Sequence, residues 1–237
     1  MARTADDRAE AIMTAARQLF HAHGPDATTI DAVAAQAGVG KGTVFLYWPS
    51  KSRLRQAVVQ LETARLLAEL SDDLRSGSVA LTLSAILSRE ITEAAINPNM
   101  VSRIMSLGET GVDDFPSEVV HQLILSMRRH GLLRDVDIDE MVAALEMLAT
   151  GALSAVLAHP ERMPTILAST QRLLSATYDQ APPSAQASAQ ALAEATAAIE
   201  AGINQLVAAA APNRPTTAVF HPRGHAYEPV RDCGWGL

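Results

Sequence analysis

The sequence predicts an all-α protein, and three observations support this fold class. Aromatic residues make up only 4% of the 237 residues, alanine is frequent, and runs of β-branched residues are few. This composition favours helices over strands. Apolar residues recur at helical spacing in several segments, and glycine or proline separates these segments. A chain of this length buries a substantial core, as one large or two modest domains.

The stretch from 28 to 51 predicts two short helices joined by a glycine turn. Thr28 is a suitable N-cap for the first helix, and Asp31 supports it as the acid of a capping box does. Gly38 stands where a helix ends in the left-handed conformation. The predicted buried face of this helix consists of Ile30, Val33, Ala34 and Ala37. The layout is that of a helix-turn-helix, whose second helix enters the DNA major groove.

The second helix is predicted from about Gly40 to Tyr47, with Val44 facing inward beside Leu46 or Trp48. Its two glycines cost roughly 1 kcal/mol each relative to alanine. They either mark a poorly formed turn or allow close approach to a sugar-phosphate backbone. The residues left toward solvent or DNA are Lys41, Gly42, Thr43, Phe45 and Tyr47.

A third helix is predicted to begin after Pro49 with Ser50 as its cap. Its first turn carries Lys51, Arg53 and Arg55, and each cation opposes the helix macrodipole by about 0.3–1 kcal/mol. This mismatch suggests that an anion such as a DNA phosphate binds at this helix end. The alternative interpretation is a solvated basic face.

The segment from about Arg8 to Leu54 resembles the N-terminal domain of TetR-family transcriptional regulators. The matching residues are Ile12, Ala15, Ala16, Leu19, Phe20, Gly24, Thr28, Thr29, Ile30, Val33, Ala34, Ala37, Gly38, Val39, Lys41, Gly42, Thr43, Tyr47, Ser50, Lys51 and Leu54. The resemblance implies an all-helical homodimer, DNA binding by the first three helices, and a ligand-responsive C-terminal domain. Three positions depart from the usual family pattern: Gly40 replaces Ser, Phe45 replaces Tyr and Arg53 replaces Glu.

These considerations assign the DNA contacts. Lys41, Thr43 and Phe45 are expected at or near base edges, and Thr28, Tyr47 and Lys51 at phosphates. The complete predicted set is Thr28, Thr29, Gly40, Lys41, Gly42, Thr43, Phe45, Tyr47 and Lys51. The charge distribution agrees, although the whole chain carries −7. Residues 1–60 hold seven Lys/Arg and five Asp/Glu, a net of +2, which leaves −9 for the remainder. A basic DNA-binding segment on an otherwise acidic chain limits non-specific affinity for DNA.

Three domains are predicted: a DNA-binding domain over 6–66 with its reading motif at about 29–48, a ligand-binding and dimerisation domain over 67–180, and an extension over 181–237. The helices expected beyond the reading motif are 50–75, 79–96, 99–107, 117–130, 137–159, 164–178 and an alanine-rich 184–211. A tail rich in proline and glycine follows Pro212 and is expected to pack on the body or a partner, or to be disordered.

The helices over 137–159 and 164–178 carry wide apolar stripes, which suits a four-helix bundle formed with a second copy of the chain. The alternative is an ordinary intrachain core. The predicted interface residues are Met141, Leu145, Leu148, Ala152, Val156, Leu167 and Leu174. A dimer also suits function, because two readers recognise a palindrome spaced by whole DNA turns.

The resemblance places a pocket for an unknown small-molecule effector between residues 79 and 159. Flexible methionines suit an adaptable cavity, although such residues are more often plain core. A lone Arg103 in the pocket would favour an anionic or acyl ligand. The candidate lining residues are Met100, Arg103, Met105, Phe115, His121, Met127 and Met147.

Enzyme chemistry has little support in the sequence. Glu118 and His121 have the Glu-x-x-His spacing of di-iron bundles, but no second copy is present. Phosphate-binding glycine loops and nucleophile elbows are also missing. His221, His225 and Cys233 lack diagnostic metal spacing. We therefore predict no catalytic residue, no metal and no cofactor.

A cytoplasmic location without membrane contact is expected, because the N-terminus is polar, one cysteine excludes an intramolecular disulfide, and no apolar run approaches 18 residues. The predicted function is a ligand-responsive repressor that binds a palindromic double-stranded operator as a homodimer. The alternatives are an activator or a ligand-independent regulator of the same fold and, remotely, a helical-bundle metalloenzyme.

Overall fold

The computed structural model describes residues 5–96 and 117–213, and these ranges are helical throughout their regular parts. The helices are α1 (Ala5–His23), α2 (Ile30–Ala37), α3 (Lys41–Tyr47), α4 (Lys51–Ser76), α5 (Leu83–Ile96), α7 (Ser117–Arg129), α8 (Ile138–Ala158), the 3-10 turn η1 (Pro160–Arg162), α9 (Met163–Thr177) and α10 (Ala185–Ala210). The predicted all-α class is confirmed. The helix expected over 99–107 lies outside the described residues.

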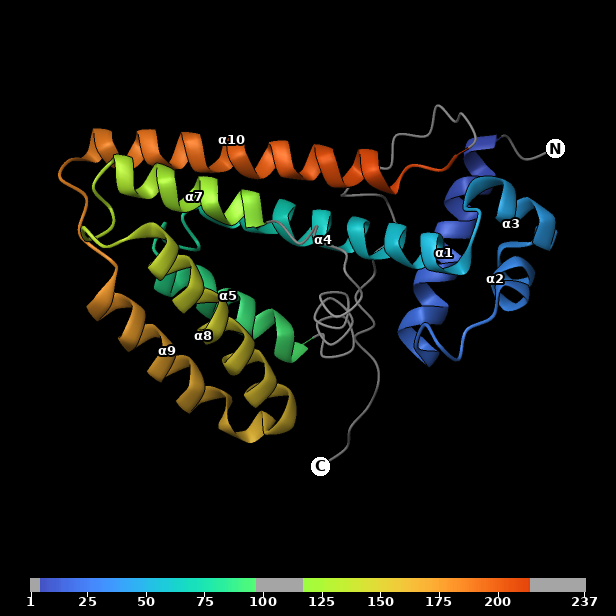
Figure 1. The fold of residues 1–237 in the computed structure, drawn as a ribbon, viewed down its shortest axis with the longest axis horizontal. Coiled ribbons are helices and arrows are strands. Elements are labelled where there is room, and N and C mark those ends of the chain that lie inside the picture. The colour runs from blue at the N-terminus through green and yellow to red at the C-terminus, as the bar shows by residue number, and fades with distance from the viewer. Residues whose placement is uncertain (1–4, 97–116, 214–237) are drawn as a thin grey trace.

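The N-terminal helices pack around their own core, which we call the head: α1, α2, α3 and residues 51–61 of α4. Its buried side chains include Ile12, Phe20, Val33, Val44, Trp48, Leu54 and Val58. Figure 1 shows the head at one end of the long axis, with α4 leaving it toward the rest of the molecule. One further member of this core, Ala210, comes from the C-terminal end of α10.

The body consists of α5, α7, α8 and α9 around a second core. Helix α5 was expected from residue 79 but begins at Leu83, because the carboxylate of Asp179 accepts hydrogen bonds from the amides of Leu83 (2.8 Å) and Ser84 (3.3 Å). The Asp179 cap lies almost 100 residues away in sequence, and Thr82 caps the same helix start locally, since its hydroxyl accepts from the amide of Ala85 at 3.2 Å. The guanidinium of Arg89 joins α5 to α4 through Asp73 at 2.9 Å.

Helix α10 confirms the alanine-rich helix predicted over 184–211 and has Ser184 as its N-cap. It runs antiparallel to α4 along the length of the molecule, and α7 also packs against it (Figure 1). A third apolar cluster fills the space between these helices, with Ala64, Ala68 and Leu74 from α4, Val119 from α7, and Ile199, Ile203 and Leu206 from α10. Helix α4 thus changes core partners midway along its length, after Leu61.

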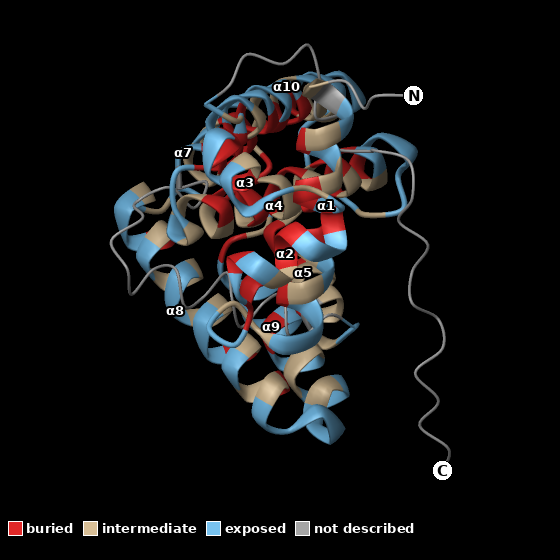
Figure 2. Cartoon of the chain, turned by 90° about the vertical axis from the view of Figure 1, so that its right-hand side faces the viewer, coloured by how far each residue is buried: buried red, intermediate tan, exposed pale blue. Residues whose placement is uncertain are grey.

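Helices α8 and α9 remain the least covered part of the body. Figure 2 shows much of their surface in the colours of exposed and intermediate residues. By length and composition α8 could cross a membrane, with a mean hydropathy of 1.8 and 17% of its apolar window buried. The expectation that no apolar segment approaches 18 residues was therefore wrong for this helix. Core helices of soluble proteins pass the same length and composition test, but they are mostly buried.

Candidate nucleic-acid interface

The cap of α2 is Thr29 and not Thr28 as predicted. The hydroxyl of Thr29 accepts from the amide of Ala32 at 3.1 Å, and its extended backbone (φ −100°, ψ 155°) is that of a cap. The buried Thr28 hydroxyl instead donates to the carbonyl oxygen of Gly24 at 2.8 Å and lies 3.2 Å from that of Leu19. Thr28 therefore fastens the end of α1, and its assignment as a phosphate contact was wrong.

The turn between α2 and α3 agrees with the prediction. Gly38 has φ 65° and ψ 38°, the left-handed conformation, and its amide bonds back into α2. The predicted buried face of α2 is also confirmed, with Ile30, Val33, Ala34 and Ala37 all buried. These features hold α3 at a fixed angle to α2.

The two glycines of α3 are not required by the packing of the head. A Cβ added at Gly42 would meet nothing within 4 Å, and one at Gly40 would lie 3.9 Å from Thr43 Oγ1, an ordinary contact. Gly40 is the N-cap of α3 and provides no side-chain cap, as its departure from the family pattern predicts. The surface at this helix start is open to an external backbone.

The outer face of α3 carries one cation and two large apolar side chains. The side chain of Lys41 is 52% exposed, and its ammonium lies 2.7 Å from the Asp31 carboxylate. Phe45 is 39% exposed, as expected for a DNA-facing residue, and Leu46 is 58% exposed. Leu46 was not among the residues predicted to face solvent or DNA. The helical spacing could have placed Leu46 on the outer face. Val44 and Trp48 both point inward, so Leu46, two residues from each, lies on the opposite side of the helix.

Tyr47 does not belong to this outer face. It is completely buried, and its hydroxyl donates to the carbonyl oxygen of Ala5 at 2.9 Å. Its ring centroid lies 6.0 Å from that of Trp48. The expectation that Tyr47 contacts a phosphate was wrong, because its position three residues after Val44 places it on the same inward side.

The basic first turn of α4 has two different uses. Ser50 caps the helix by accepting from the amide of Arg53 at 3.0 Å, as predicted. Lys51 Nζ donates to the carbonyl oxygen of Asp26 at 3.1 Å and stays near the surface. Arg53 donates to the carbonyl oxygen of Ala209 in the last turn of α10. The mismatch between Arg53 and the dipole of α4 thus has an internal explanation, the carboxyl end of another helix.

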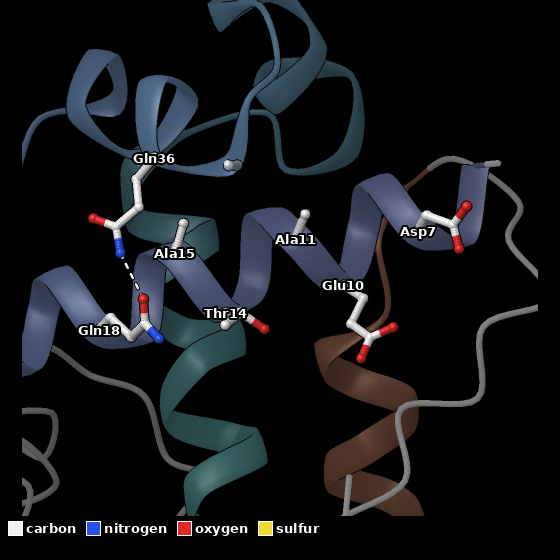
Figure 3. A pocket seen from close by; sticks show the side chains of 8 residues that line it. Asp7, Glu10, Ala11, Thr14, Ala15, Gln18 and Gln36 are labelled. Carbon is white, nitrogen blue, oxygen red and sulfur yellow. Dashed lines mark hydrogen bonds between the residues drawn. The ribbon is translucent and has the colours of Figure 1, made fainter. Parts of the chain in front are cut away.

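A shallow depression of about 340 Å³ lies on the head between α1 and α2. Figure 3 shows Asp7 and Glu10 on one side of it and the amides of Gln18 and Gln36 joined by a hydrogen bond at the other. Its two carboxylates have the wrong charge for a phosphate. The depression therefore adds nothing to the DNA-binding surface on α3.

Three of the predicted effector residues, His121, Met127 and Met147, lie in the part of the chain that the structure describes. Met127 is fully buried in the body core, and Met147 is 71% exposed on α8. His121 is partly buried on α7. Met100, Arg103, Met105 and Phe115 lie outside the described residues.

Four of the predicted dimer residues are instead part of the core of one chain. Met141, Ala152, Val156 and Leu174 are buried among body side chains, which corrects their assignment to an interface. Leu145, Leu148 and Leu167 are partly buried against the same core. The large apolar side chains that face outward are Met147 on α8 and Leu173 on α9, the latter 55% exposed.

Within residues 5–96 and 117–213, no group of three or more His, Cys, Asp or Glu residues is placed to hold a metal ion. The carboxylate of Glu118, one half of the Glu-x-x-His pattern, accepts from the side-chain amide of Gln122 at 2.9 Å. His221, His225 and Cys233 lie outside the described residues.

Comparison with known proteins agrees with this geometry. The family model described as "Bacterial regulatory proteins, tetR family" matches residues 12–58, which span α1 to the first part of α4. No match to a curated protein sequence is found.

Solved structures share the fold over most of the chain. A putative TetR-family transcription regulator from Shewanella sp. PV-4 is 22% identical, with a TM-score of 0.53 over 75% of this chain and all of its own. A TetR-family regulator from Pseudomonas syringae pv. tomato is 21% identical, with a TM-score of 0.51 over the same shares. The Bacillus subtilis regulator FadR, solved with stearoyl-CoA, is 14% identical, with a TM-score of 0.50 over 70% of this chain and 97% of its own.

The matched segment coincides with the helix-turn-helix that the structure contains, and the helical body follows it as in these structures. Residues 12–58 therefore form a helix-turn-helix DNA-binding domain of the TetR type, and the described chain has the fold of these TetR-family structures.

Proposed function

We propose that this protein is a transcriptional regulator of the TetR type, a ligand-responsive repressor that acts in the cytoplasm as a homodimer on a palindromic operator. The observation that carries the proposal is the pairing of two exposed surfaces at different ends of one chain. The outer face of α3 offers a surface for DNA recognition, and the outer face of α8 and α9 offers an apolar surface for a second copy of the chain.

The reading surface has the features of a major-groove helix. Lys41 supplies a cation at the start of α3, Thr43 a hydroxyl, and Phe45 and Leu46 apolar groups suited to thymine methyls. The open space at Gly42 allows the helix to approach the DNA backbone closely. We assign base-edge contacts to Lys41, Thr43 and Phe45. Phosphate contacts fall to Thr29, Lys51 and the amides at Gly40 and Gly42.

The dimer surface is inferred from the outer side of the α8–α9 pair. Met147 and Leu173 are mostly exposed in the single chain, and small residues such as Ala143, Gly151 and Ala176 surround them. Apolar patches that stay exposed in a monomer mark interaction sites. A lipid environment fits less well, because α8 also carries Asp139, Glu140 and Glu146, and an acid within a bilayer costs roughly 2.5–3.5 kcal/mol. A second copy of the chain suits both the apolar centre and the acidic flank.

The effector remains an unknown small molecule in this proposal. We place its site in the body beside α7, where His121 is the described candidate. Release of DNA requires that the effector favour a body conformation in which the two heads no longer match successive major grooves. A long-chain acyl-CoA is a sensible first probe, since it joins an acyl chain to an anionic group.

The decisive experiment is selection of bound duplexes from a random DNA pool by the purified full-length protein. We expect enrichment of a palindrome with half-sites one or more helical turns apart. An Ala197→Ser variant, changed on the exposed side of α10, should enrich the same motif. A pool that stays random with the wild-type protein would refute sequence-specific DNA binding. Screening metabolites for release of the selected duplex then tests ligand response.

A further inference from the structure

Helix α10 is fastened to the head by its last turn. The indole Nε1 of Trp48 lies 3.3 Å from the carbonyl oxygen of Ala210, and Arg53 donates to that of Ala209. The amide of Asn213, just past the helix, donates to the carbonyl oxygen of Tyr47 at 2.8 Å. The last carbonyls of a helix have no partner within it. The head therefore caps α10, and the Arg53 cation also suits the negative end of its dipole.

The other half of α10 is fastened to α7 in the body. The buried hydroxyl of Ser126 donates to the carbonyl oxygen of Ala191 at 3.1 Å. The carboxylate of Glu194 lies 2.6 Å from the guanidinium of Arg129 and 3.1 Å from His130 Nε2. These contacts hold α10 at the carboxyl end of α7, far from the head.

Gly202 fixes how closely α10 approaches α7. A Cβ added at this position would lie 2.2 Å from Val119 Cγ2, so the backbone of α10 rests directly on the valine side chain. Val119 is itself buried in the cluster that α4, α7 and α10 share. A change in the position of α7 must therefore move α10 or open a gap in this cluster, and close-packed interiors resist such gaps.

We propose that α10 is a second mechanical link between body and head, parallel to the covalent link through α4, and that it carries displacements of α7 to the DNA-reading helix. The 26-residue helix spans roughly 39 Å at the usual rise per residue. It is held at one end by α7 and capped at the other by Trp48 and Arg53. Because α3 ends at Tyr47, any movement of the last turn of α10 acts directly on the end of the reading helix. This inference rests on the proposed function, since it describes how the body regulates the same DNA-binding site.

The test uses Trp48 as a reporter in the full-length protein. In a Trp235→Phe background Trp48 is the only tryptophan of the chain. Gly202→Ala should force α10 away from α7 at a point distant from the indole. We expect higher acrylamide quenching of Trp48, faster amide exchange in the last turn of α10, and a change of about fivefold or more in affinity for the selected DNA, as typical coupling energies predict.

Three further variants make the result decisive. Ala201→Ser alters the neighbouring exposed position and should change none of these readouts. Leu174→Ala destabilises the body core from α9, which packs mainly against α5 and α8, and should leave Trp48 quenching unchanged. Glu194→Ala removes an exposed ion pair between α10 and the end of α7 without adding volume. It replaces Gly202→Ala in the same measurements if Gly202→Ala does not fold.

The proposal is overturned if amide exchange shows α10 loosened at α7 while Trp48 quenching or DNA affinity stays at the wild-type value. It is equally overturned if Leu174→Ala changes Trp48 as much as Gly202→Ala does, because the effect would then be general destabilisation. Trp48 quenching is measured without DNA, so it tests the link between body and head independently of DNA binding. A wild-type protein that selects no DNA sequence would refute the proposed function alone.

Discussion

Trp48 Nε1 and the carbonyl oxygen of Ala210 lie 3.3 Å apart, although 162 positions separate the two residues in sequence. The contact is buried and joins the end of the reading helix to the end of α10. Trp48→Phe keeps an aromatic ring in the core but removes the donor. We expect a loss of roughly 1–3 kcal/mol in the free energy of unfolding, because the buried carbonyl of Ala210 loses its donor and the smaller ring leaves space in the core. Urea titration of the variant measures it.

Leu46→Ala is the matched control for this prediction. Leu46 lies two residues before Trp48 but is mostly exposed, so its truncation should change stability by no more than about 0.5 kcal/mol. An equal loss in both variants would mean that the indole hydrogen bond contributes nothing to stability.

Substitutions at Thr28 and Thr29 should distinguish effects on the stability of the head from effects on DNA binding. Thr29→Ala removes the cap of α2 and should cost about 1 kcal/mol of stability. Thr28→Val removes a buried hydroxyl that bonds the end of α1, so it should destabilise the head while leaving the salt dependence of DNA binding unchanged. Thermal unfolding and binding titrations at several salt concentrations distinguish the two effects. A flatter salt dependence in Thr28→Val would restore Thr28 as a phosphate contact.

Lys51→Ala should weaken binding to every DNA sequence. Each phosphate contact contributes about 0.9 to the slope of log K against log salt, and a bound homodimer loses two such contacts, so the slope should fall by about 1.8. Arg134→Ala, changed in the loop between α7 and α8, is the control and should leave the slope unchanged. An unaltered slope in Lys51→Ala would show that the ammonium serves only the carbonyl oxygen of Asp26.

Thr43→Ala should alter which DNA is bound more than how strongly DNA in general is bound. A lost base-edge contact costs roughly 1–3 kcal/mol of discrimination at one position. Repeating the random-pool selection with the variant measures this, and we expect relaxed preference at one symmetric pair of positions. An unchanged motif would remove Thr43 from the set of base-reading residues.

Met147→Glu should convert a dimer into a monomer at micromolar concentration. A charge placed at the centre of an apolar interface is desolvated without a partner, which is strongly unfavourable. Sedimentation equilibrium measures the change. Ala197→Glu, on the exposed side of α10, should leave the association state unaltered. A Met147→Glu protein that stays dimeric would place the interface elsewhere.

Acidification should loosen α10 from α7. Contact with His130 Nε2, together with the guanidinium of Arg129, lowers the pKa of the exposed Glu194 below its ordinary value of 4.5. A lowered pKa stabilises the folded chain above the ordinary value, and this contribution disappears as the pH falls through the folded value. Amide exchange of α10 measured across this range should accelerate at low pH, and Glu194→Gln should lessen the dependence. Identical profiles for both proteins would refute the assignment.

The sequence predicted the head well because its signals are local. Gly38, the Ser50 cap and the buried face of α2 follow from spacing within a few residues, and all three were confirmed. Thr28 and Tyr47 were misplaced for a shared reason: polar groups that bond to the backbone of α1 look the same in sequence as polar groups that face DNA.

Contacts across long separations could not be predicted. The capping of α5 by Asp179 and of α10 by Arg53 joins segments that no periodicity relates. The stripe on α8 was identified as apolar, but periodicity does not say which part packs inside the chain. Met141 and Val156 were therefore predicted at the dimer interface although they are buried, and Met147, predicted in the effector pocket, is the one that faces outward.

The presence of Ala210 in the head core has a consequence for how the protein is made. Domains usually complete their folding in the order in which the ribosome releases them. Here about 150 residues are synthesised between the head segment of α4 and its last core residue, which takes on the order of 10 s at usual elongation rates. The head of a nascent chain consequently lacks the α10 part of its core until synthesis is nearly complete. Premature termination anywhere before α10 yields a head whose indole donor and Arg53 have lost the carbonyls they bind.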